Sequence, residues 1–144
     1  MTSGTGDEIA VLDVQTCWQL VVGEEVGRLA VSVDRQPDIY PVNYAVEKET
    51  IVFCTAEGTK LSALSVDAFV AFEVDGWDAE TGTAWSVVIK GRAVEVAMYD
   101  LLDDLAFPLF SWTVTPKPRF VRIVPKEITG RRFHVVRRGP GPTR

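Results

Sequence analysis

The stretch RLAVSVDRQPDIYPVNYAVEKETIVFCT, residues 28–55, decides the fold class of this chain. Three runs rich in β-branched and apolar residues alternate in it with two short polar turns, in the order 28–33, 34–37, 38–46, 47–49 and 50–55. Strands joined by such short turns pair as antiparallel hairpins, whereas parallel strands need a crossover of about a dozen residues or more. The stretch therefore predicts an antiparallel meander in a mainly β protein.

The rest of the chain adds further strands and a few short helices. Strands are predicted at 68–74, 84–97, 120–124 and 128–136, and helices at 14–22, 61–65 and 98–107. Asp13 can cap the first helix and Gly23 can end it, while Gly91 inside the longest strand indicates a bend or bulge at a barrel corner. Six or so strands with two or three short helices favour a closed or split barrel over an immunoglobulin-type sandwich.

The length of 144 residues suits a single domain. We expect a disordered N-terminus over 1–10, the folded domain over 11–136 and a basic flexible tail over 137–144. The longest apolar runs, such as Trp85–Ile89, are far too short to cross a bilayer, and the N-terminus shows no secretion signal. The sequence therefore predicts a cytoplasmic protein without a membrane partner.

The net charge and the numbers of histidine and cysteine residues limit the kinds of partner and site that can be expected. The net charge of −5 leaves an acidic body without the basic face that a nucleic-acid partner needs. The arginines after residue 130 belong to a solvated terminus or reach an acidic group on a partner or ligand. His134 is the single histidine, and Cys17 and Cys54 are too far apart for a CxxC pair, so neither a metal site nor a Ser-His-Asp triad is expected. A bound cofactor would have to supply any difficult chemistry.

One candidate binding segment is Pro41-Val42-Asn43-Tyr44. Pro41 removes a donor from the strand ladder, which indicates a sheet edge or a bulge. Asn43 and Tyr44 then present polar groups beside exposed backbone, which suits a flat heterocycle with hydrogen-bonding groups along one edge. An ordinary strand bend would carry the same proline.

Two further segments carry candidate ligand-binding groups. The loop after residue 53 contains Thr55, Gly58, Thr59 and Lys60, which together offer hydroxyl donors, a flexible backbone and one cation for a phosphate. A capped loop with a solvated lysine would look the same. At the start of the longest strand, Trp85 could stack on a ring system and Ser86 could donate to it, although a tryptophan there is equally a core residue.

Taken in order, these segments resemble the pyridoxamine 5′-phosphate oxidase-like superfamily, the flavin-binding split barrels, and within it the small actinobacterial branch akin to nitroimidazole reductases. The likeness runs from about Leu12 to Phe133. Five segments carry it: Gly27–Leu29, Pro41–Tyr44, Thr55–Lys60, Trp85–Val87 with Gly91 and Arg92, and Ile128–Phe133.

The resemblance implies a six-stranded antiparallel split β-barrel that forms a homodimer with two FMN sites at the interface, acting as an FMN-dependent oxidoreductase on a small-molecule substrate. By position, Thr55, Thr59 and Lys60 would hold the phosphate, and Val42 and Asn43 would face the isoalloxazine largely through backbone. Trp85 and Ser86 would line the same pocket, from either subunit.

Two departures from the family limit the activity that the resemblance implies. Cys54 stands where nitroimidazole-type relatives tend to have a histidine, and the chain lacks the extended C-terminal substrate segment of true pyridoxamine phosphate oxidases. Two alternatives stay open on the same fold. One is a reductase that uses a 5-deazaflavin, whose acidic tail would need a basic groove from Arg28, Arg92, Lys117 and Arg119. The other is a module that binds a flavin or another small ligand without turnover.

Overall fold

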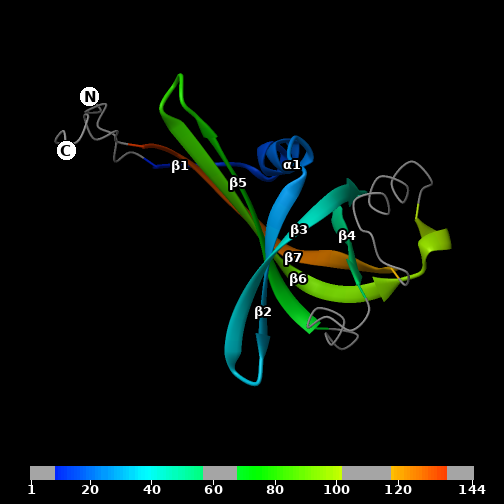
Figure 1. Ribbon diagram of the computed structural model, residues 1–144. Coiled ribbons are helices and arrows are strands. Elements are labelled where there is room, and N and C mark those ends of the chain that lie inside the picture. The colour runs from blue at the N-terminus through cyan, green and yellow to red at the C-terminus, as the bar shows by residue number, and fades with distance from the viewer. Residues whose placement is uncertain (1–8, 57–67, 102–117, 136–144) are drawn as a thin grey trace, which may run out of the picture.

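The computed structural model describes residues 9–56, 68–101 and 118–135, which form an antiparallel β-barrel with one α-helix packed against it (Figure 1). The helix is α1, Val14–Val22. The strands are β1 Ile9–Val11, β2 Val26–Val33, β3 Gln36–Glu47, β4 Thr50–Ala56, β5 Ala68–Asp78, β6 Thr83–Val96 and β7 Pro118–His134.

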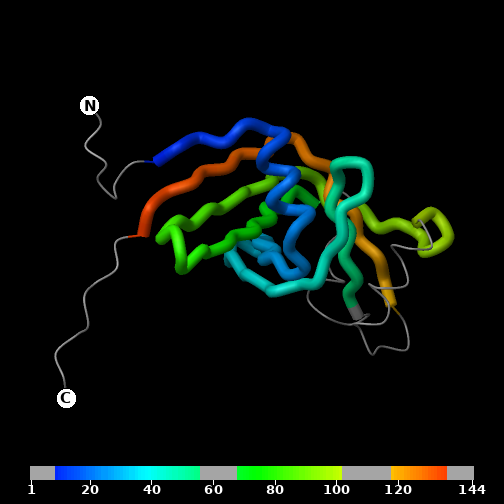
Figure 2. The backbone as a smooth tube through the Cα atoms, turned by 90° about the horizontal axis from the view of Figure 1, so that it is seen from above, coloured from blue at the N-terminus to red at the C-terminus, as the bar shows by residue number. Residues whose placement is uncertain are grey.

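The barrel closes because the last strand pairs on both of its edges. The strand order is β1-β7-β4-β3-β2-β5-β6, and β6 pairs back onto β7, so six strands form a closed ring. The first half of β7 also pairs with β4, and its second half pairs with β1, which is the seventh strand of the sheet. Figure 2 shows β7, in orange to red, running from its start near β4 to its end beside β1. The predicted six-stranded antiparallel barrel is confirmed.

The core lies inside this ring, where alternate residues of each strand point. Leu29, Phe53, Phe72, Ile89 and Ile123 are among the fully buried side chains. Because side chains alternate between the two faces of a strand, the intervening residues form the outer face of the barrel.

Helix α1 covers part of this core and has the predicted bounds. The Asp13 carboxylate accepts a hydrogen bond from the Thr16 N–H at 2.8 Å, and the helix ends at Gly23, as predicted. Cys17 is fully buried against Gly130 of β7, where a Cβ would lie 2.5 Å from the Cys17 Sγ. The glycine therefore allows the helix to approach the strand closely. No helix in the described ranges is long and apolar enough to span a membrane.

Gly91 marks the predicted irregularity in the longest strand. The pairing of β6 with β7 shifts register between Lys90 and Gly91, opposite Pro125. A Cβ at Gly91 would lie 2.1 Å from the Val124 carbonyl oxygen, so only glycine fits this close approach of two backbones. The bulge also explains one wrong boundary, because the two strands predicted at 120–124 and 128–136 are the single strand β7, which passes through the bulge.

Two other strand boundaries differ from the predictions. Strand β5 was expected to end at Val74 in an acidic loop, but it continues to Asp78 because residues 75–78 pair with β6. Ile9 and Ala10 were expected in a disordered terminus, but they pair with Phe133 and Arg132 as part of β1. In both places backbone pairing with a distant strand overrides a polar or terminal sequence.

Of the predicted helices, the structure describes the first in full and the third in part. Helix α1 is the one α-helix of the described residues. The predicted helix at 98–107 begins as a single 3₁₀ turn over Met98–Asp100, and Leu101 is already extended. Leu101 is buried against Val52 and Phe120, and residues 102–107 lie outside the described residues. The helix predicted at 61–65 lies outside the described residues.

Candidate functional site

Strand β3 changes its neighbour halfway along its length. Residues 36–43 pair with β2, whereas residues 44–47 pair with β4. Continuing the second register by two residues would set Val42 across from Thr55, but the ladder stops at Tyr44 and Phe53. Within the described ranges, the side of β3 over 36–43 that faces away from β2 therefore has no neighbouring strand.

The backbone groups on this free edge can be assigned. The Tyr44 N–H donates to the Glu25 carbonyl at 3.0 Å, on the β2 side. Because alternate residues of a strand direct both backbone groups to the same side, Pro37, Ile39, Pro41 and Asn43 direct theirs to the free edge. Both prolines lack an N–H, so the donors there are the amides of Ile39 and Asn43, while Pro37, Ile39 and Pro41 keep a carbonyl acceptor away from β4. Among the described residues, this agrees with the sheet edge that Pro41 indicates as one of two alternatives.

The side chains of the segment divide between two faces. Val42 and Tyr44 point into the core and are 8% and 6% exposed, whereas Pro41 and Asn43 point outward. The Tyr44 hydroxyl donates to the Val21 carbonyl, and its ring meets Phe72 edge-to-face at 5.1 Å. Burial, together with the nearby Glu24, raises the pKa of Tyr44. The Tyr44 side chain is thus part of the core, and a ligand at this edge would contact the backbone of Pro41 and Asn43.

Of the residues predicted to hold a phosphate, Thr55 lies in the described part, while Gly58, Thr59 and Lys60 lie outside it. Thr55 is 5% exposed and follows the inward-pointing Phe53 by two residues. It pairs directly with Arg119 of β7. The two residues therefore share one face of the barrel near the end of β4.

Arg119 is held by Glu95 of β6 through a two-pronged contact. The guanidinium Nε donates to Oε2 at 2.9 Å and Nη2 donates to Oε1 at 2.5 Å. These hydrogen bonds from Arg119 lower the pKa of the Glu95 carboxyl. The sequence suggested Arg119 only for a deazaflavin tail. Its place opposite Thr55 follows from the pairing of β4 with β7, which no local pattern reveals.

Trp85 and Ser86 point to opposite faces of β6. The Trp85 indole packs over Gly76 of β5, where a Cβ would lie 2.4 Å from Nε1, and it belongs to the barrel core. Ser86 points outward, between Asp75 and Arg131 in the register. Since β2 and β5 separate β3 from β6, Ser86 lies about 14 Å from Asn43 by strand spacing. Among the described residues, Asn43, Trp85 and Ser86 are therefore not brought together on one surface of a single protomer.

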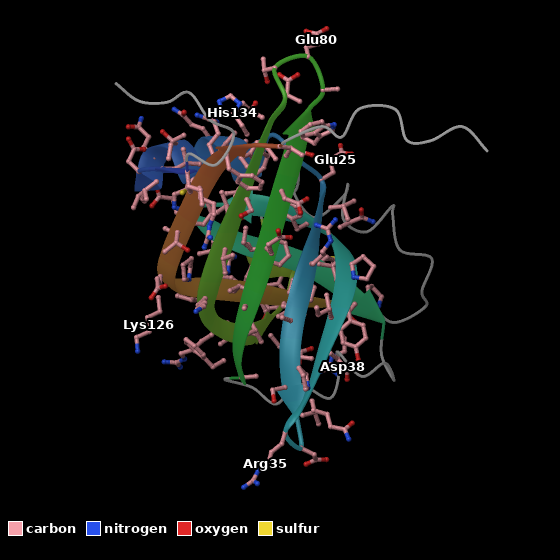
Figure 3. All side chains as sticks on the ribbon, turned by 90° about the vertical axis from the view of Figure 1, so that its left-hand side faces the viewer. Glu25, Arg35, Asp38, Glu80, Lys126 and His134 are labelled. Atoms are coloured by element: carbon pink, nitrogen blue, oxygen red, sulfur yellow. The ribbon has the colours of Figure 1, made fainter. Side chains whose placement is uncertain are left out.

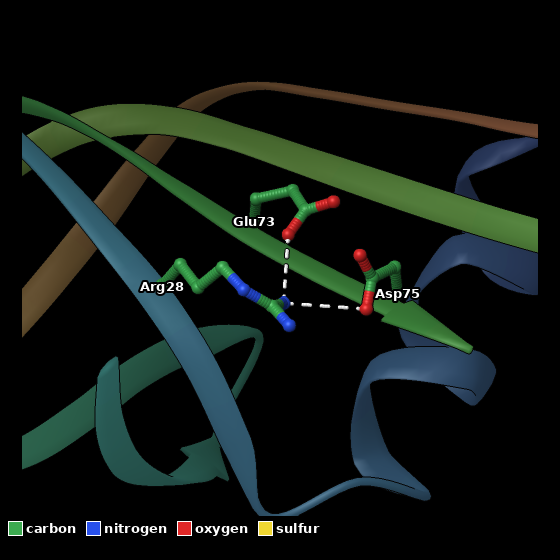
Figure 4. Close-up of polar contacts among 3 residues, drawn as sticks. All are labelled: Arg28, Glu73 and Asp75. Atoms are coloured by element: carbon green, nitrogen blue, oxygen red, sulfur yellow. Dashed lines mark hydrogen bonds and ion pairs between the residues drawn. The ribbon is translucent and has the colours of Figure 1, made fainter. Parts of the chain in front are cut away.

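Two of the arginines suggested for a deazaflavin tail, Arg28 and Arg119, point to opposite faces of the barrel. Arg28 lies on the outer face, where its Nη1 contacts Glu73 at 3.1 Å and Asp75 at 3.2 Å (Figure 4). Arg119 points inward and is engaged by Glu95, and Lys117 lies outside the described residues. Cys54, in the position of the histidine in nitroimidazole-type relatives, packs on the outer face beside Val52 and Phe120.

Comparison with known proteins agrees with this architecture. A family model described as pyridoxamine 5′-phosphate oxidase matches residues 13–132. The uncharacterized protein Rv3129 of Mycobacterium tuberculosis is 42% identical over 101 residues, which span 69% of this chain and 86% of that protein.

Two solved structures have a similar fold. An FAD-binding protein from Mycobacterium smegmatis superimposes with a TM-score of 0.70 at 32% identity, over 88% of this chain and 100% of that one. An FAD-binding protein from Mesorhizobium loti does so with a TM-score of 0.76 at 26% identity, over 88% of this chain and 98% of that one. The chain belongs to the pyridoxamine 5′-phosphate oxidase family of split barrels.

Proposed function

We propose that this protein is a flavin-dependent oxidoreductase that binds the flavin ring along the free edge of β3, as a homodimer in which two copies complete each site. The observation that carries the proposal is the edge itself, because the N–H of Asn43 and the carbonyl of Pro41 face a side on which no described strand pairs with them. The pyrimidine end of a flavin offers alternating acceptors and a donor, which match such a backbone edge.

Two other observations support the proposal. Thr55 offers a hydroxyl near the end of β4 for the phosphate of a flavin nucleotide, while Arg119, directly opposite, is paired with Glu95. Relatives at 32% and 26% identity are described as FAD-binding. The sequence favours FMN through Thr55, Thr59 and Lys60, so both nucleotides are candidates.

The chain's own residues would bind and orient the cofactor, which supplies the redox chemistry when it is bound. The ring would be held by backbone groups whose positions are fixed by the β2–β3 ladder, so the site is rigid before the ligand arrives. Pro37 and Pro41 keep the edge from pairing with another strand, because each removes one donor from the ladder. The edge therefore stays available to a small flat ligand.

The cofactor is tested first on the purified protein. We expect a flavin absorbance spectrum and an extracted pigment with the mass of FMN or FAD. Titrating the ligand-free protein with FMN, FAD and a 5-deazaflavin then separates the three candidates. Turnover is tested by reducing the bound flavin and adding electron acceptors, and a loaded protein that reduces none of them would be a carrier. Failure of all three ligands to bind at micromolar concentration would refute the proposal.

A matched pair of variants tests the backbone edge. Asn43→Pro removes the amide that faces the free edge, and Asn43→Ala keeps it. Proline fits because residues 37 and 41 of the same edge are already prolines and residue 42 is extended. We expect Asn43→Pro to weaken flavin binding about tenfold, the value of one hydrogen bond, and Asn43→Ala to change it little. Equal affinities of the two variants would exclude this amide as a ligand.

The phosphate assignment is tested separately at Lys60. Lys60→Ala removes the cation that the sequence places in the phosphate loop, so we expect the affinity for FMN to fall sharply while riboflavin, which lacks the phosphate, binds as before. Lys48→Ala, in the exposed turn between β3 and β4, is the control for loss of a lysine. Wild-type affinity of Lys60→Ala for FMN would overturn the assignment.

A further inference from the structure

A small cavity lies at the far end of β7, where this strand pairs with β1 on one edge and with β6 on the other. Its volume is about 190 Å³, and its lining residues are Ile9, Ala10, Thr83, Arg132, Phe133 and His134. The phosphate candidate Thr55 pairs with Arg119, at the opposite end of β7. Within one protomer, the cavity is therefore separate from the proposed flavin site.

Four of the lining side chains share one face of the sheet. Ala10 pairs with Arg132 and Thr83 pairs with His134, and directly paired residues point to the same face. Helix α1 covers this face at Gly130. Arg132 and His134, two and four residues further along, are exposed. The face therefore continues beyond the helix as a surface that solvent and small ligands can reach.

The lining is positively charged and contains no acidic side chain. Its ionisable residues are Arg132 and His134, and neither side chain forms a hydrogen bond or an ion pair within the described ranges. In contrast, the guanidiniums of Arg28, Arg119 and Arg122 each contact a carboxylate. Arg132 thus has its N–H donors available for a ligand or for water.

The acidic residue in the same row of the sheet is already engaged. Asp78 pairs with Thr83, which pairs with His134, so two strand spacings of about 4.8 Å separate Asp78 from His134. The Asp78 carboxylate accepts hydrogen bonds from the backbone N–H groups of Glu80 at 2.9 Å and Thr81 at 3.4 Å. It therefore stabilises the β5–β6 turn and does not neutralise the two basic residues.

The size of the cavity and its charge define the ligand class. Arg132 and His134 are two residues apart on one face, so about 6.6 Å of strand separates them, and both side chains can reach one oxyanion. A carboxylate suits them, because a guanidinium donates two parallel hydrogen bonds to its oxygens. A bare anion would leave much of the cavity empty, whereas a flavin needs a pocket larger than roughly 300 Å³.

We propose that this cavity binds a small carboxylate with an uncharged body of about one ring, independently of the flavin. Arg132 would donate to both carboxylate oxygens, and a ring N–H of His134 would donate to one of them. Ala10, the smallest of the four side chains on this face, would leave room for the body of the ligand. The inference goes beyond the proposed function, because these residues belong neither to the β3 edge nor to the phosphate loop.

Benzoate is the probe, and the protein supplies the reporter. His134 is the single histidine of the chain, so the proton between its two ring nitrogens gives one isolated NMR signal. Titration of the full chain with benzoate at constant pH and ionic strength should shift this signal saturably, with a Kd of about 1 mM for so small a ligand. Benzamide has the same shape without the charge and should not shift it. No saturable shift, or an equal response to benzamide, would overturn the proposal.

A matched pair of variants tests the contact with the guanidinium. Arg132→Gln removes the charge of an exposed side chain and should weaken benzoate binding about tenfold, measured by saturation transfer to the benzoate protons. Arg35→Gln makes the same change in the turn between β2 and β3, which lies far from His134 (Figure 3), and should bind benzoate like the wild type. Equal melting temperatures would show that both variants fold. Wild-type affinity of Arg132→Gln, or an equal loss in Arg35→Gln, would overturn the site.

Flavin titrations separate this cavity from the proposed function. Arg132→Gln should bind FMN as the wild type does, and saturating FMN should leave the affinity for benzoate unchanged. Competition between FMN and benzoate would show that they share one site and would overturn the proposal of a separate cavity. A protein that binds benzoate but no flavin would refute the proposed function and leave this site standing.

Discussion

Replacing Gly27 by alanine should destabilise the barrel through one contact. A Cβ on Gly27 would lie 2.3 Å from Cζ of Phe72 and within 2.9 Å of both Cε atoms. Carbon atoms pack at about 3.5–4.0 Å, so the ring would have to move by more than about 1 Å. Phe72 is fully buried and Tyr44 meets its ring edge-to-face, so the ring has little room. The overpacking cost of about 3 kcal/mol exceeds the gain of about 0.5–1 kcal/mol from replacing a strand glycine, which leaves about 2 kcal/mol.

A double-mutant cycle measured by urea unfolding tests this explanation. Phe72→Leu alone removes ring atoms from the core and should cost about 1–2 kcal/mol. In the double variant the new methyl group enters the space that the ring leaves, so the combined loss should be smaller than the sum by about 1 kcal/mol or more. All variants are compared at one protein concentration, because a dimer's stability depends on it.

Gly23→Ala is the matched control for the glycine substitution. Its nearest neighbour beyond the adjacent residues would be the Leu20 carbonyl at 3.5 Å, an ordinary contact, and its φ is −79°. We expect a change within about 0.5 kcal/mol, or a small gain from reduced freedom of the unfolded chain. Two results would refute the steric reasoning: a neutral Gly27→Ala, or losses that add within about 0.5 kcal/mol in the cycle.

Three further variants probe other contacts. Arg122→Met removes the guanidinium that donates to Glu47 at 2.7 Å, and the Glu47 side chain is only 7% exposed. Urea unfolding should therefore show a loss of about 3 kcal/mol, because a buried carboxylate is left without its partner, and Glu47→Leu in the same chain should largely restore the stability. A double variant that is no more stable than Arg122→Met would contradict this explanation. Tyr44→Phe should lower the free energy of unfolding by about 1 kcal/mol, because one buried hydrogen bond to Val21 is lost, and an unchanged value would show that the bond adds nothing. The cap hydrogen bonds from Thr16 lower the pKa of Asp13 in the folded state from its ordinary value of 3.8. The ionised carboxylate therefore stabilises the fold fully above that pH, and this stabilisation is lost as the pH falls through the lowered pKa of the folded state. Asp13→Asn still caps the helix, so its melting temperature should fall less than that of the wild type below pH 3.8, and identical profiles would contradict the assignment.

Local patterns were sufficient for most of the elements. The bounds of α1 follow from Asp13 and Gly23, because capping depends on the residues at the helix ends. The hairpins were also predicted, although their turns are tighter than expected. Asp34 and Arg35 have φ of 52° and 65°, so the turn holds two residues instead of four. A two-residue hairpin needs this left-handed backbone, and without glycine in the sequence the tight turn was not evident.

Arrangements that depend on distant strands could not be read from the chain. Whether Trp85 or Ser86 faces the core depends on the phase of β6 against β5, and the Gly76 beneath the indole is the one local hint. Thr55 meets Arg119 because β4 pairs with β7, 64 positions later in the sequence, and no periodicity encodes that register. Predicting Trp85 and Ser86 as joint lining of one pocket overlooked the alternation of side chains along a strand.

The free edge of β3 explains why the residues of the candidate site looked unremarkable in sequence. A ligand held by the amide of Asn43 and the carbonyl of Pro41 would use backbone groups, which every residue type except proline offers in full. The residue types that mark such a site in the sequence are therefore the prolines, which lack a backbone N–H. Pro37 and Pro41 fall on one side of the strand because four residues separate them, and that side is the one that β4 leaves. The same two prolines thus discourage strand pairing and leave Asn43 as the last donor before the strands rejoin. Recognition by backbone predicts that substitutions of the Asn43 side chain are tolerated as long as its N–H remains.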